Sequence, residues 1–155
     1  VIDGIDGCGK STQAGLLAHA LRTETGRAVL HVREPGSTAL GERLREILLG
    51  RELELGAAVE TLLFTAARRQ MLDELVGPAL ARGEHVVCER FHPSTFAYQA
   101  WAGGLAERDV LDLLARWAGE PGPDLVLLLD LSAELAATRR GGASSKPRYG
   151  AASPA

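Results

Sequence analysis

The chain has 155 residues, 46% of them apolar, with a formal net charge of -3 and a pI near 5.8. This length and apolar fraction suit one globular domain with a substantial core. The acidic balance argues against nucleic-acid or anionic-membrane partners, because these require a basic face, and no apolar run approaches the roughly 18–20 residues of a membrane span. Two cysteines in a chain of this size make no disulfide framework, so we expect a cytoplasmic protein.

Short apolar runs alternate with helical patterns in the first third of the chain. Val1 and Ile2 are typical of the last residues of a strand, so we expect the domain to be incomplete at its amino-terminal end. A helix is predicted over 11–25, with Gly26 as its cap and an apolar face made of Leu16, Leu17, Ala20 and Leu21. A strand follows over 28–32, then a turn-rich loop over 33–38 and a helix that carries Leu40, Leu44, Ile47 and Leu48 and ends at Gly50.

The alternation continues through the rest of the chain. A long helix is predicted over 57–81, with a break near Gly77 and Pro78, because proline lacks a backbone donor and restricts the residue before it. The remaining predicted elements are a strand over 85–88, helices over 93–101 and 106–117, a very apolar strand over 125–129 and a helix over 133–140. Strands joined by crossover helices predict a three-layer α/β fold, with a parallel sheet flanked by helices.

Residues 4–11 satisfy the P-loop pattern G-x-x-x-x-G-K-[ST] between a strand and a helix. The glycines let backbone N–H groups converge on phosphates, Lys10 reaches the β- and γ-phosphates, and the Ser11 hydroxyl ligates Mg²⁺. The start of the following helix adds positive partial charge. We therefore expect ATP or GTP to bind with Mg²⁺, and the predicted nucleotide-binding residues are Asp6, Gly7, Cys8, Gly9, Lys10, Ser11 and Thr12.

Four arginines fall at strand ends, or on helices expected around the carboxyl edge of the sheet, where open α/β sheets bind ligands: Arg33, Arg45, Arg68 and Arg90. A guanidinium pairs with two phosphate oxygens at once, so this set favours a second site for a phosphate-bearing acceptor. Each arginine taken singly is also compatible with a solvated helix face or a surface ion pair.

Four spaced motifs together give a family resemblance. They are Gly-Ile-Asp-Gly-Cys-Gly-Lys-Ser-Thr-Gln at 4–13, Arg-Glu-Pro-Gly-Ser-Thr at 33–38, Phe-Thr-Ala-Ala-Arg at 64–68 and Glu-Arg-Phe-His-Pro-Ser-Thr-Phe-Ala-Tyr-Gln at 89–99. In this order they resemble bacterial thymidylate kinases, over residues 1 to about 140. The resemblance implies one P-loop nucleoside monophosphate kinase domain over 1–155. Its activity would be transfer of the γ-phosphate of ATP to dTMP, giving dTDP for dTTP synthesis.

The resemblance also assigns roles by position. Asp6 would contact the sugar 3′-hydroxyl of dTMP, Phe64 would stack on thymine and Arg68 would donate to a thymine carbonyl. The other implied contacts are Thr95 and Gln99 along the base, Tyr98 near the sugar, Arg45 and Arg90 on the acceptor phosphate, and Glu34 near that phosphate. From the residues alone, Phe64 could equally be a core residue and Tyr98 a packed helix residue.

Catalysis would depend on Lys10, Arg90 and a further arginine. In this family that arginine comes from the P-loop or from a mobile lid; here the P-loop position is Gly7, so the lid is implied. The segment from about 141 to 155 is rich in glycine, serine, proline and alanine, which suits the start of a mobile lid and a domain incomplete at this end as well. Arg148 is the residue we place there, with Arg139 and Arg140 as alternatives. A homodimer packed through the long helices is also part of the family pattern.

Departures from the pattern keep alternatives open. The usual Asp-Arg-Tyr is Glu89-Arg90-Phe91 here, which lengthens the carboxylate that would serve the metal together with Ser11. Glu-Arg at this position also occurs in deoxynucleoside kinases, and the short carboxyl end leaves a non-catalytic nucleotide-binding regulatory domain as a third hypothesis. The usual Gly-Gly-Thr is Gly-Ser-Thr at 36–38, which adds a side chain where the backbone needs freedom. The four histidines have no metal-ligand spacing, so we expect them to be packed or solvated. We expect Trp101 and Trp117 to be core or interface residues. Asp130 is expected to be a helix cap or a Walker-type carboxylate.

Overall fold

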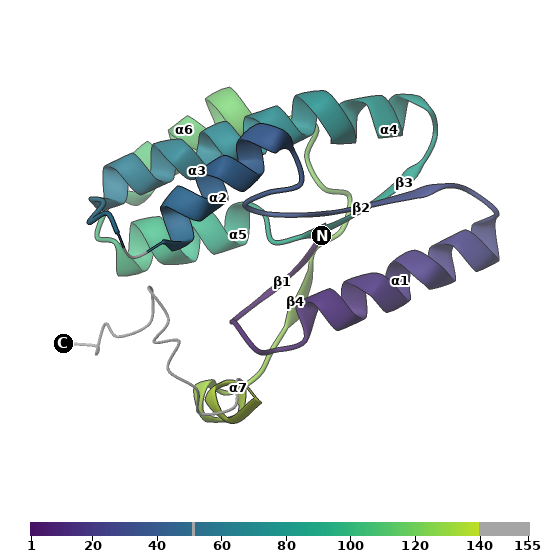
Figure 1. Ribbon diagram of the computed structural model, residues 1–155, viewed down its shortest axis with the longest axis horizontal. Coiled ribbons are helices and arrows are strands. Elements are labelled where there is room, and N and C mark those ends of the chain that lie inside the picture. The colour runs from purple at the N-terminus through teal and green to yellow at the C-terminus, as the bar shows by residue number, and fades with distance from the viewer. Residues whose placement is uncertain (51, 140–155) are drawn as a thin grey trace.

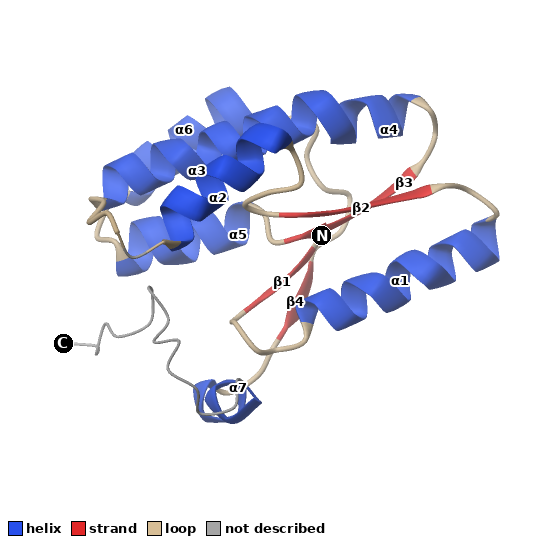
Figure 2. Ribbon diagram, in the orientation of Figure 1, coloured by secondary structure: helices blue, strands red, loops and turns tan. Residues whose placement is uncertain are grey.

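A computed structural model describes residues 1–50 and 52–139 of the chain (Figure 1). Within these residues, four parallel strands form one sheet in the order β2-β3-β1-β4. The strands are β1 (Ile2–Gly4), β2 (Val29–Arg33), β3 (His85–Glu89) and β4 (Leu127–Leu129). Helices flank this sheet on both sides (Figure 2), so the predicted three-layer α/β fold is confirmed.

The helices fall close to their predicted positions. They are α1 (Lys10–Thr25), α2 (Ala39–Leu49), α3 (Ala57–Met71), α4 (Gly77–Ala81), α5 (His92–Thr95), α6 (Glu107–Ala118) and α7 (Ala133–Arg139). Gly26 follows α1 in a left-handed conformation with φ 68°, which confirms its predicted capping role. No helix in the described ranges is both long enough and apolar enough to cross a membrane.

The strand register brings three loops to one edge of the sheet. Glu89 at the end of β3 lies opposite Arg33 at the end of β2 and opposite Ile2 in β1. The chain leaves β1 and β3 toward opposite sides of the sheet, and such a switch point is where open α/β sheets bind ligands. The loops that follow β1, β2 and β3 therefore meet at this edge.

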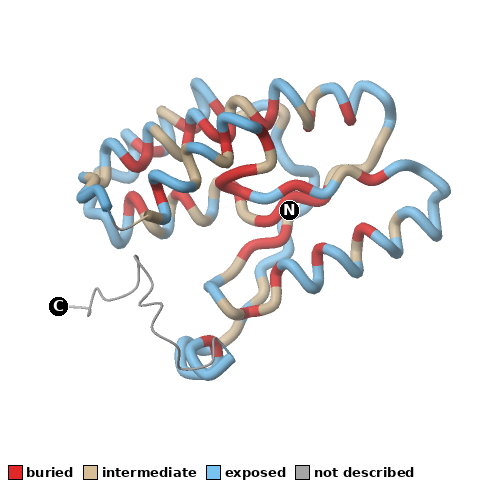
Figure 3. Tube along the Cα trace, in the orientation of Figure 1, coloured by how far each residue is buried: buried red, intermediate tan, exposed pale blue. Residues whose placement is uncertain are grey.

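Alternating strand residues fill two separate cores, one on each face of the sheet. Val87 and Val29 pack toward α1, and the next residue of β3, Cys88, packs with Met71 and Phe91 on the other face. The predicted apolar face of α1 is partly wrong. Leu17 and Leu21 are half-buried as expected, but Leu16 is 58% exposed and Ala20 is exposed. Figure 3 shows short buried stretches along α1 that are separated by exposed ones.

The residues of α1 that contact the sheet most closely are Ala14 and Ala18, which are almost completely buried. Their small side chains let the helix approach the strands, and this turns the larger Leu16 toward solvent. Hydrophobicity alone ranks leucine above alanine, so the sequence pattern placed Leu16 in the apolar face and left out Ala14 and Ala18.

The long helix predicted over 57–81 is continuous, without the predicted break at Gly77 and Pro78. Instead, a π-helical stretch covers Leu72–Val76, directly before these two residues. Pro78 has no N–H to donate, and its ring needs room next to the carbonyl four residues earlier. A wider π turn supplies that room, so the helix changes its winding and keeps its direction. A second π stretch, Phe96–Ala102, extends α5.

Two further predictions differ from the structure near the end of the described chain. Trp101 and Trp117 are 79% and 58% exposed, so the core alternative is wrong for both, and the interface alternative stays a prediction. Strand β4 is shorter than the predicted 125–129, and Leu128 is exposed on it. Asp130 follows β4, but the hydroxyl of Ser132 accepts the backbone hydrogen bond from Leu135 that caps α7.

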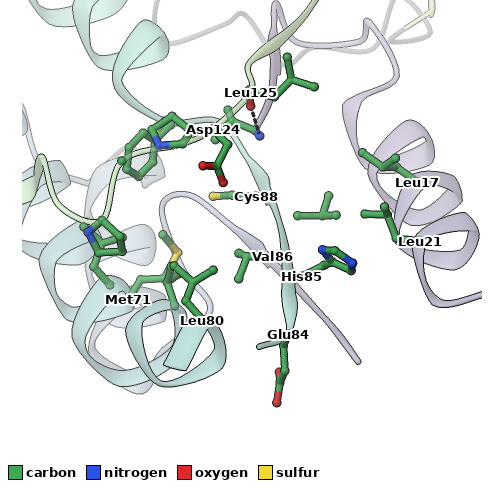
Figure 4. A pocket seen from close by; sticks show the side chains of 18 of the residues that line it. Leu17, Leu21, Met71, Leu80, Glu84, His85, Val86, Cys88, Asp124 and Leu125 are labelled. Carbon is green, nitrogen blue, oxygen red and sulfur yellow. Dashed lines mark hydrogen bonds between the residues drawn. The ribbon is translucent and has the colours of Figure 1, made fainter. Parts of the chain in front are cut away.

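A cavity of about 290 Å³ lies at the amino ends of the strands, beside Val1 and His85. Figure 4 shows its walls: Leu17 and Leu21 face it from α1, and Met71 and Leu80 face it from the opposite side. Its lining is mainly apolar and lacks arginine and lysine. This cavity is therefore at the edge of the sheet opposite the P-loop, and none of the described residues brings an arginine or lysine to it.

Candidate active site

The P-loop connects β1 to α1 with the geometry that its motif requires. Gly4 has a φ of 142°, and a Cβ there would lie 2.6 Å from the carbonyl oxygen of Leu129 in β4, so only glycine fits. Lys10 is buried, and its ammonium donates to the carbonyl oxygens of Gly4 (3.0 Å) and Ile5 (2.8 Å). Burial, followed by the nearby positive charge of Arg90, lowers the pKa of Lys10. The lysine is thus held at the mouth of the loop, at the start of a sixteen-residue helix.

A polar cavity of about 400 Å³ opens at this edge of the sheet. It brings together residues at and after the carboxyl ends of β1, β2 and β3, with residues of α1 and α2: Asp6, Gly7, Gly9, Lys10, Ser11, Thr12, Arg33, Glu34, Arg45, Glu89 and Arg90. Most of the predicted nucleotide, phosphate and metal residues therefore share one cavity. Cys8 is buried beneath it, with its sulfur 3.8 Å from the Lys10 nitrogen.

Arg90 directly follows β3, and its side chain lies against the P-loop. Its guanidinium donates to the Gly4 carbonyl (3.1 Å) and the Ser94 hydroxyl (2.7 Å), pairs with Asp6, and lies 5.6 Å from the centre of the Tyr98 ring. Burial acts to lower the pKa of Arg90, but Tyr98 and the nearby carboxylates outweigh it, and the pKa is raised. Arg90 also has a positive φ of 68°, which is uncommon for a residue with a side chain. These contacts hold the cation in a strained position facing the cavity.

Glu34 and Arg68 form a buried ion pair behind the cavity. The Nε atom of Arg68 lies 2.8 Å from both carboxylate oxygens of Glu34, and Arg68 Nη2 also donates to the Thr95 hydroxyl at 2.9 Å. The guanidinium lies 4.7 Å above the centre of the Phe91 ring. Burial raises the pKa of Glu34, and the charge of Arg68 opposes this shift. The pair joins the loop after β2 to α3 and α5.

Two of the predicted substrate-binding residues carry a buried nitrogen that has no hydrogen-bond partner among the described residues: Arg68 Nη1 and Gln99 Nε2. Leaving a buried donor unsatisfied costs about 1–3 kcal/mol, so each such group in a folded protein requires an explanation. Phe64 lies one helical turn before Arg68 on α3, half-buried on the same side of the helix. An aromatic ring can stack on a flat heterocycle, and two buried donors can bond to its carbonyl oxygens.

The loop after β2 is fixed by a network around Glu42. This carboxylate accepts hydrogen bonds from the Ser37 backbone N–H (2.7 Å) and from the Arg33 guanidinium (3.0 Å to each oxygen). Ser37 has a φ of 70°, so the position that the sequence indicated as needing backbone freedom does adopt a left-handed conformation. Arg45 donates to the Pro35 carbonyl at 2.8 Å, and burial lowers its pKa.

Two residues at the site were missed by sequence reasoning. Asp3 in β1 is buried and accepts hydrogen bonds from the Ser94 hydroxyl (2.6 Å) and from backbone N–H groups after β3. His31 in β2 lies 2.9 Å from a Glu89 oxygen, although it was expected to be only packed or solvated. The sequence offers no signal for them, because both lie in the middle of their strands and neither belongs to a recognisable motif. Arg148 lies outside the described residues, as does Arg140, and Arg139 is the last residue of α7.

The fold and cavity define the class of this protein: a P-loop kinase fold with arginines around the phosphate-binding edge. The sequence model of the family described as thymidylate kinase matches residues 2–150. A thymidylate kinase of Neisseria gonorrhoeae is 46% identical over 149 residues, which cover 96% of this chain and 71% of the relative. One of Paraburkholderia xenovorans is 46% identical over 151 residues, 95% of this chain and 72% of the relative.

A crystal structure of thymidylate kinase from Ehrlichia chaffeensis superposes with a TM-score of 0.78 at 33% identity, covering 89% of this chain and 78% of the other. The likeness thus extends from sequence to three-dimensional structure. The chain belongs to the thymidylate kinase family.

Proposed function

We propose that this protein transfers the γ-phosphate of ATP to dTMP and so forms dTDP and ADP. The observation that carries the proposal is the polar cavity that Lys10 and Ser11 of the P-loop share with Arg45 and Arg90. Family membership supports this activity over the two other hypotheses, a deoxynucleoside kinase and a regulatory domain without transfer activity.

The chemistry makes modest demands on the protein. The acceptor oxygen belongs to a phosphate monoester that is largely ionised near neutral pH, so no strong general base is needed. Positioning and charge neutralisation dominate in such a transfer. Lys10 would offset charge on the transferring group, and Arg90 and Arg45 would hold the acceptor phosphate. Glu34 lines the same cavity, where its carboxylate would keep Arg68 oriented.

The nature of the oxygens at Ser11 and Glu89 suits Mg²⁺, because hard divalent cations prefer hydroxyl, carboxylate and water ligands. The Ser11 hydroxyl donates to a Glu89 carboxylate oxygen at 2.5 Å, so both oxygens already face one point beside the P-loop. Mg²⁺ bound there would neutralise charge on the β- and γ-phosphates. The longer Glu89, in place of the usual aspartate, reaches Ser11 in this structure.

Recognition of thymine would come from the residues behind the cavity. Phe64 would stack on the base, and Arg68 Nη1 and Gln99 Nε2, which have no other partner among the described residues, would donate to it. Thr95 lies beside Arg68, Tyr98 lies near Arg90, and Asp6 would accept from the sugar 3′-hydroxyl. Hydrogen bonds to base edges supply the specificity that stacking cannot.

The catalytic lid arginine is proposed to be Arg148. The test compares Arg148→Ala with the matched variant Arg139→Ala on α7. We expect kcat to fall at least about tenfold for the first, because a transition-state cation is lost, and to stay within about twofold for the second. The reverse pattern would assign the lid role to Arg139.

A homodimer in the cytoplasm is the proposed state. Val59 and Leu62 are exposed on α3, one of the long helices through which the family pattern implies pairing. Light scattering coupled to size-exclusion chromatography should give twice the chain mass, and Leu62→Glu should give the chain mass.

The central experiment measures ADP release with dTMP, dUMP, dCMP, thymidine or no acceptor. We expect turnover to be fastest with dTMP and absent without an acceptor. Turnover with thymidine but not dTMP would identify a deoxynucleoside kinase. Tight ATP binding without acceptor-dependent turnover would instead support a regulatory domain.

A further inference from the structure

The carboxylate of Glu89 is held at both of its oxygens. Oε2 accepts the hydrogen bond from the Ser11 hydroxyl at 2.5 Å, and Oε1 lies 2.9 Å from Nε2 of His31. Carboxylate oxygens act as acceptors, so we assign His31 Nε2 as the donor in this contact. From these contacts we infer that His31 is a positioning residue, which orients Glu89 toward the Mg²⁺ of the bound nucleotide. The inference rests on the function proposed above.

The parallel register of β2 and β3 creates the contact. Arg33 lies opposite Glu89, and His31 lies opposite Val87, two residues earlier on both strands. Side chains two residues apart point to the same face of a strand, so His31 and Glu89 are diagonal neighbours. Their contact is therefore a consequence of the sheet itself, which makes it a rigid support.

His31 acts from outside the nucleotide cavity. It does not line the cavity that contains Lys10 and Ser11, but borders a neighbouring cavity of about 470 Å³ together with Glu42 and Leu75. Glu89 and Arg33 line both cavities, and of these two it is Glu89 whose side chain His31 contacts. The His31 side chain is 31% exposed and that of Glu89 11%. The contact by which His31 reaches the nucleotide cavity is its hydrogen bond with Glu89.

The extra methylene of glutamate explains why such a support is useful. Glutamate has one more rotatable bond than the aspartate found in the family pattern, and the added freedom must be lost when the carboxylate adopts one orientation. A fixed donor on the second oxygen limits that freedom before Mg²⁺ binds. Partners that orient metal-ligating groups commonly contribute 10–100-fold to metal affinity.

The test is the Mg²⁺ dependence of nucleotide binding, which needs no turnover. The dissociation constant of ADP is measured by calorimetry with Mg²⁺ and with EDTA, and bound Mn²⁺ is followed by electron paramagnetic resonance. We expect His31→Ala to weaken Mg²⁺-dependent binding about tenfold and to leave binding in EDTA within about twofold. His31→Gln, which places an amide donor near the Nε2 position, should recover most of the loss. His19→Ala, an exposed histidine on α1, is the matched control.

A second pair of variants separates support of Glu89 from a general structural role. In a Glu89→Asp background the carboxylate is one methylene shorter and cannot bond both Ser11 and His31, so His31→Ala should change Mg²⁺-dependent binding by less than about twofold. Equal effects of His31→Ala in both backgrounds, or a lower melting temperature with unchanged Mg²⁺ dependence, would overturn the inference. If the wild-type protein binds Mg²⁺-ADP but does not phosphorylate dTMP, the proposed function fails while this measurement still stands.

Discussion

The buried pair of Glu34 and Arg68 should give strongly non-additive stability effects. Arg68→Met removes the cation but keeps most of the side-chain volume, which leaves the Glu34 carboxylate buried without its charged partner. Glu34→Gln removes the carboxylate charge, which leaves the Arg68 guanidinium buried without its charged partner. Breaking a buried pair from either side costs about 3–5 kcal/mol, because the remaining charge is uncompensated. For a protein of this size such a loss lowers the melting temperature by roughly 6–20 °C.

The double variant has neither charge and should recover part of this loss. It still lacks the hydrogen bond to Thr95 and the guanidinium above Phe91, so about 1–3 kcal/mol of destabilisation remains. The coupling between the two changes should then be about 3 kcal/mol or more. Urea unfolding followed by circular dichroism measures all four corners of the cycle. Additivity within about 0.5 kcal/mol would refute the assignment of a dominant buried pair.

The pH dependence gives an independent check of the same pair. Burial already raises the pKa of Glu34 above its ordinary value of 4.5, and Arg68 opposes the shift. Arg68→Met removes that opposition, so the folded-state pKa rises further. A carboxyl with a raised folded-state pKa stabilises the fold while it is protonated, and that stability is lost as pH rises through the raised pKa. The defect of Arg68→Met should therefore be larger at pH 8 than at pH 5.

The double variant should also change substrate binding. Its KM for dTMP should rise while its KM for ATP stays nearly constant, because the Nη1 donor of Arg68 is gone.

Three shorter predictions concern the P-loop and the loop after β2. Lys10→Ala should lower kcat at least about 10²-fold in the ADP-release assay while dTMP binding by calorimetry changes little; an equal loss of dTMP affinity would contradict the role of Lys10. Ser37→Gly relieves the left-handed strain but loses the hydrogen bonds between the hydroxyl and the Arg33 backbone, so its melting temperature should stay close to that of the wild type. Ser37→Ala loses the same hydrogen bonds and keeps the strain, so it should be less stable than Ser37→Gly. The pKa of Glu42 is lowered chiefly by the Ser37 backbone N–H, so Glu42→Gln should destabilise the fold above pH 4.5. The stability difference between this variant and the wild type should vanish as pH falls through the lowered pKa. A constant difference in melting temperature across pH 3–7 would be inconsistent with this prediction.

Local sequence patterns predicted most of the secondary structure, because helix and strand periodicity depends on near neighbours. The boundaries of α2 and the cap at Gly26 followed directly from glycine and apolar spacing. The buried face of α1 did not, because the close approach of Ala14 to the sheet depends on strands far away in the sequence. The π stretch before Gly77 also depends on how the helix packs, since proline alone predicts a break.

The sequence by itself determined the P-loop, because eight consecutive residues carry its geometry and its chemistry. It also determined the family, through four motifs whose order and spacing do not depend on the fold. Only the tertiary structure decided which side chains meet. The parallel register of β2 and β3 places His31 on Glu89, and the packing of α3 against the loop after β2 buries Arg68 on Glu34. These contacts join residues 34 to 58 positions apart, and the sequence carries no local signal for such distances.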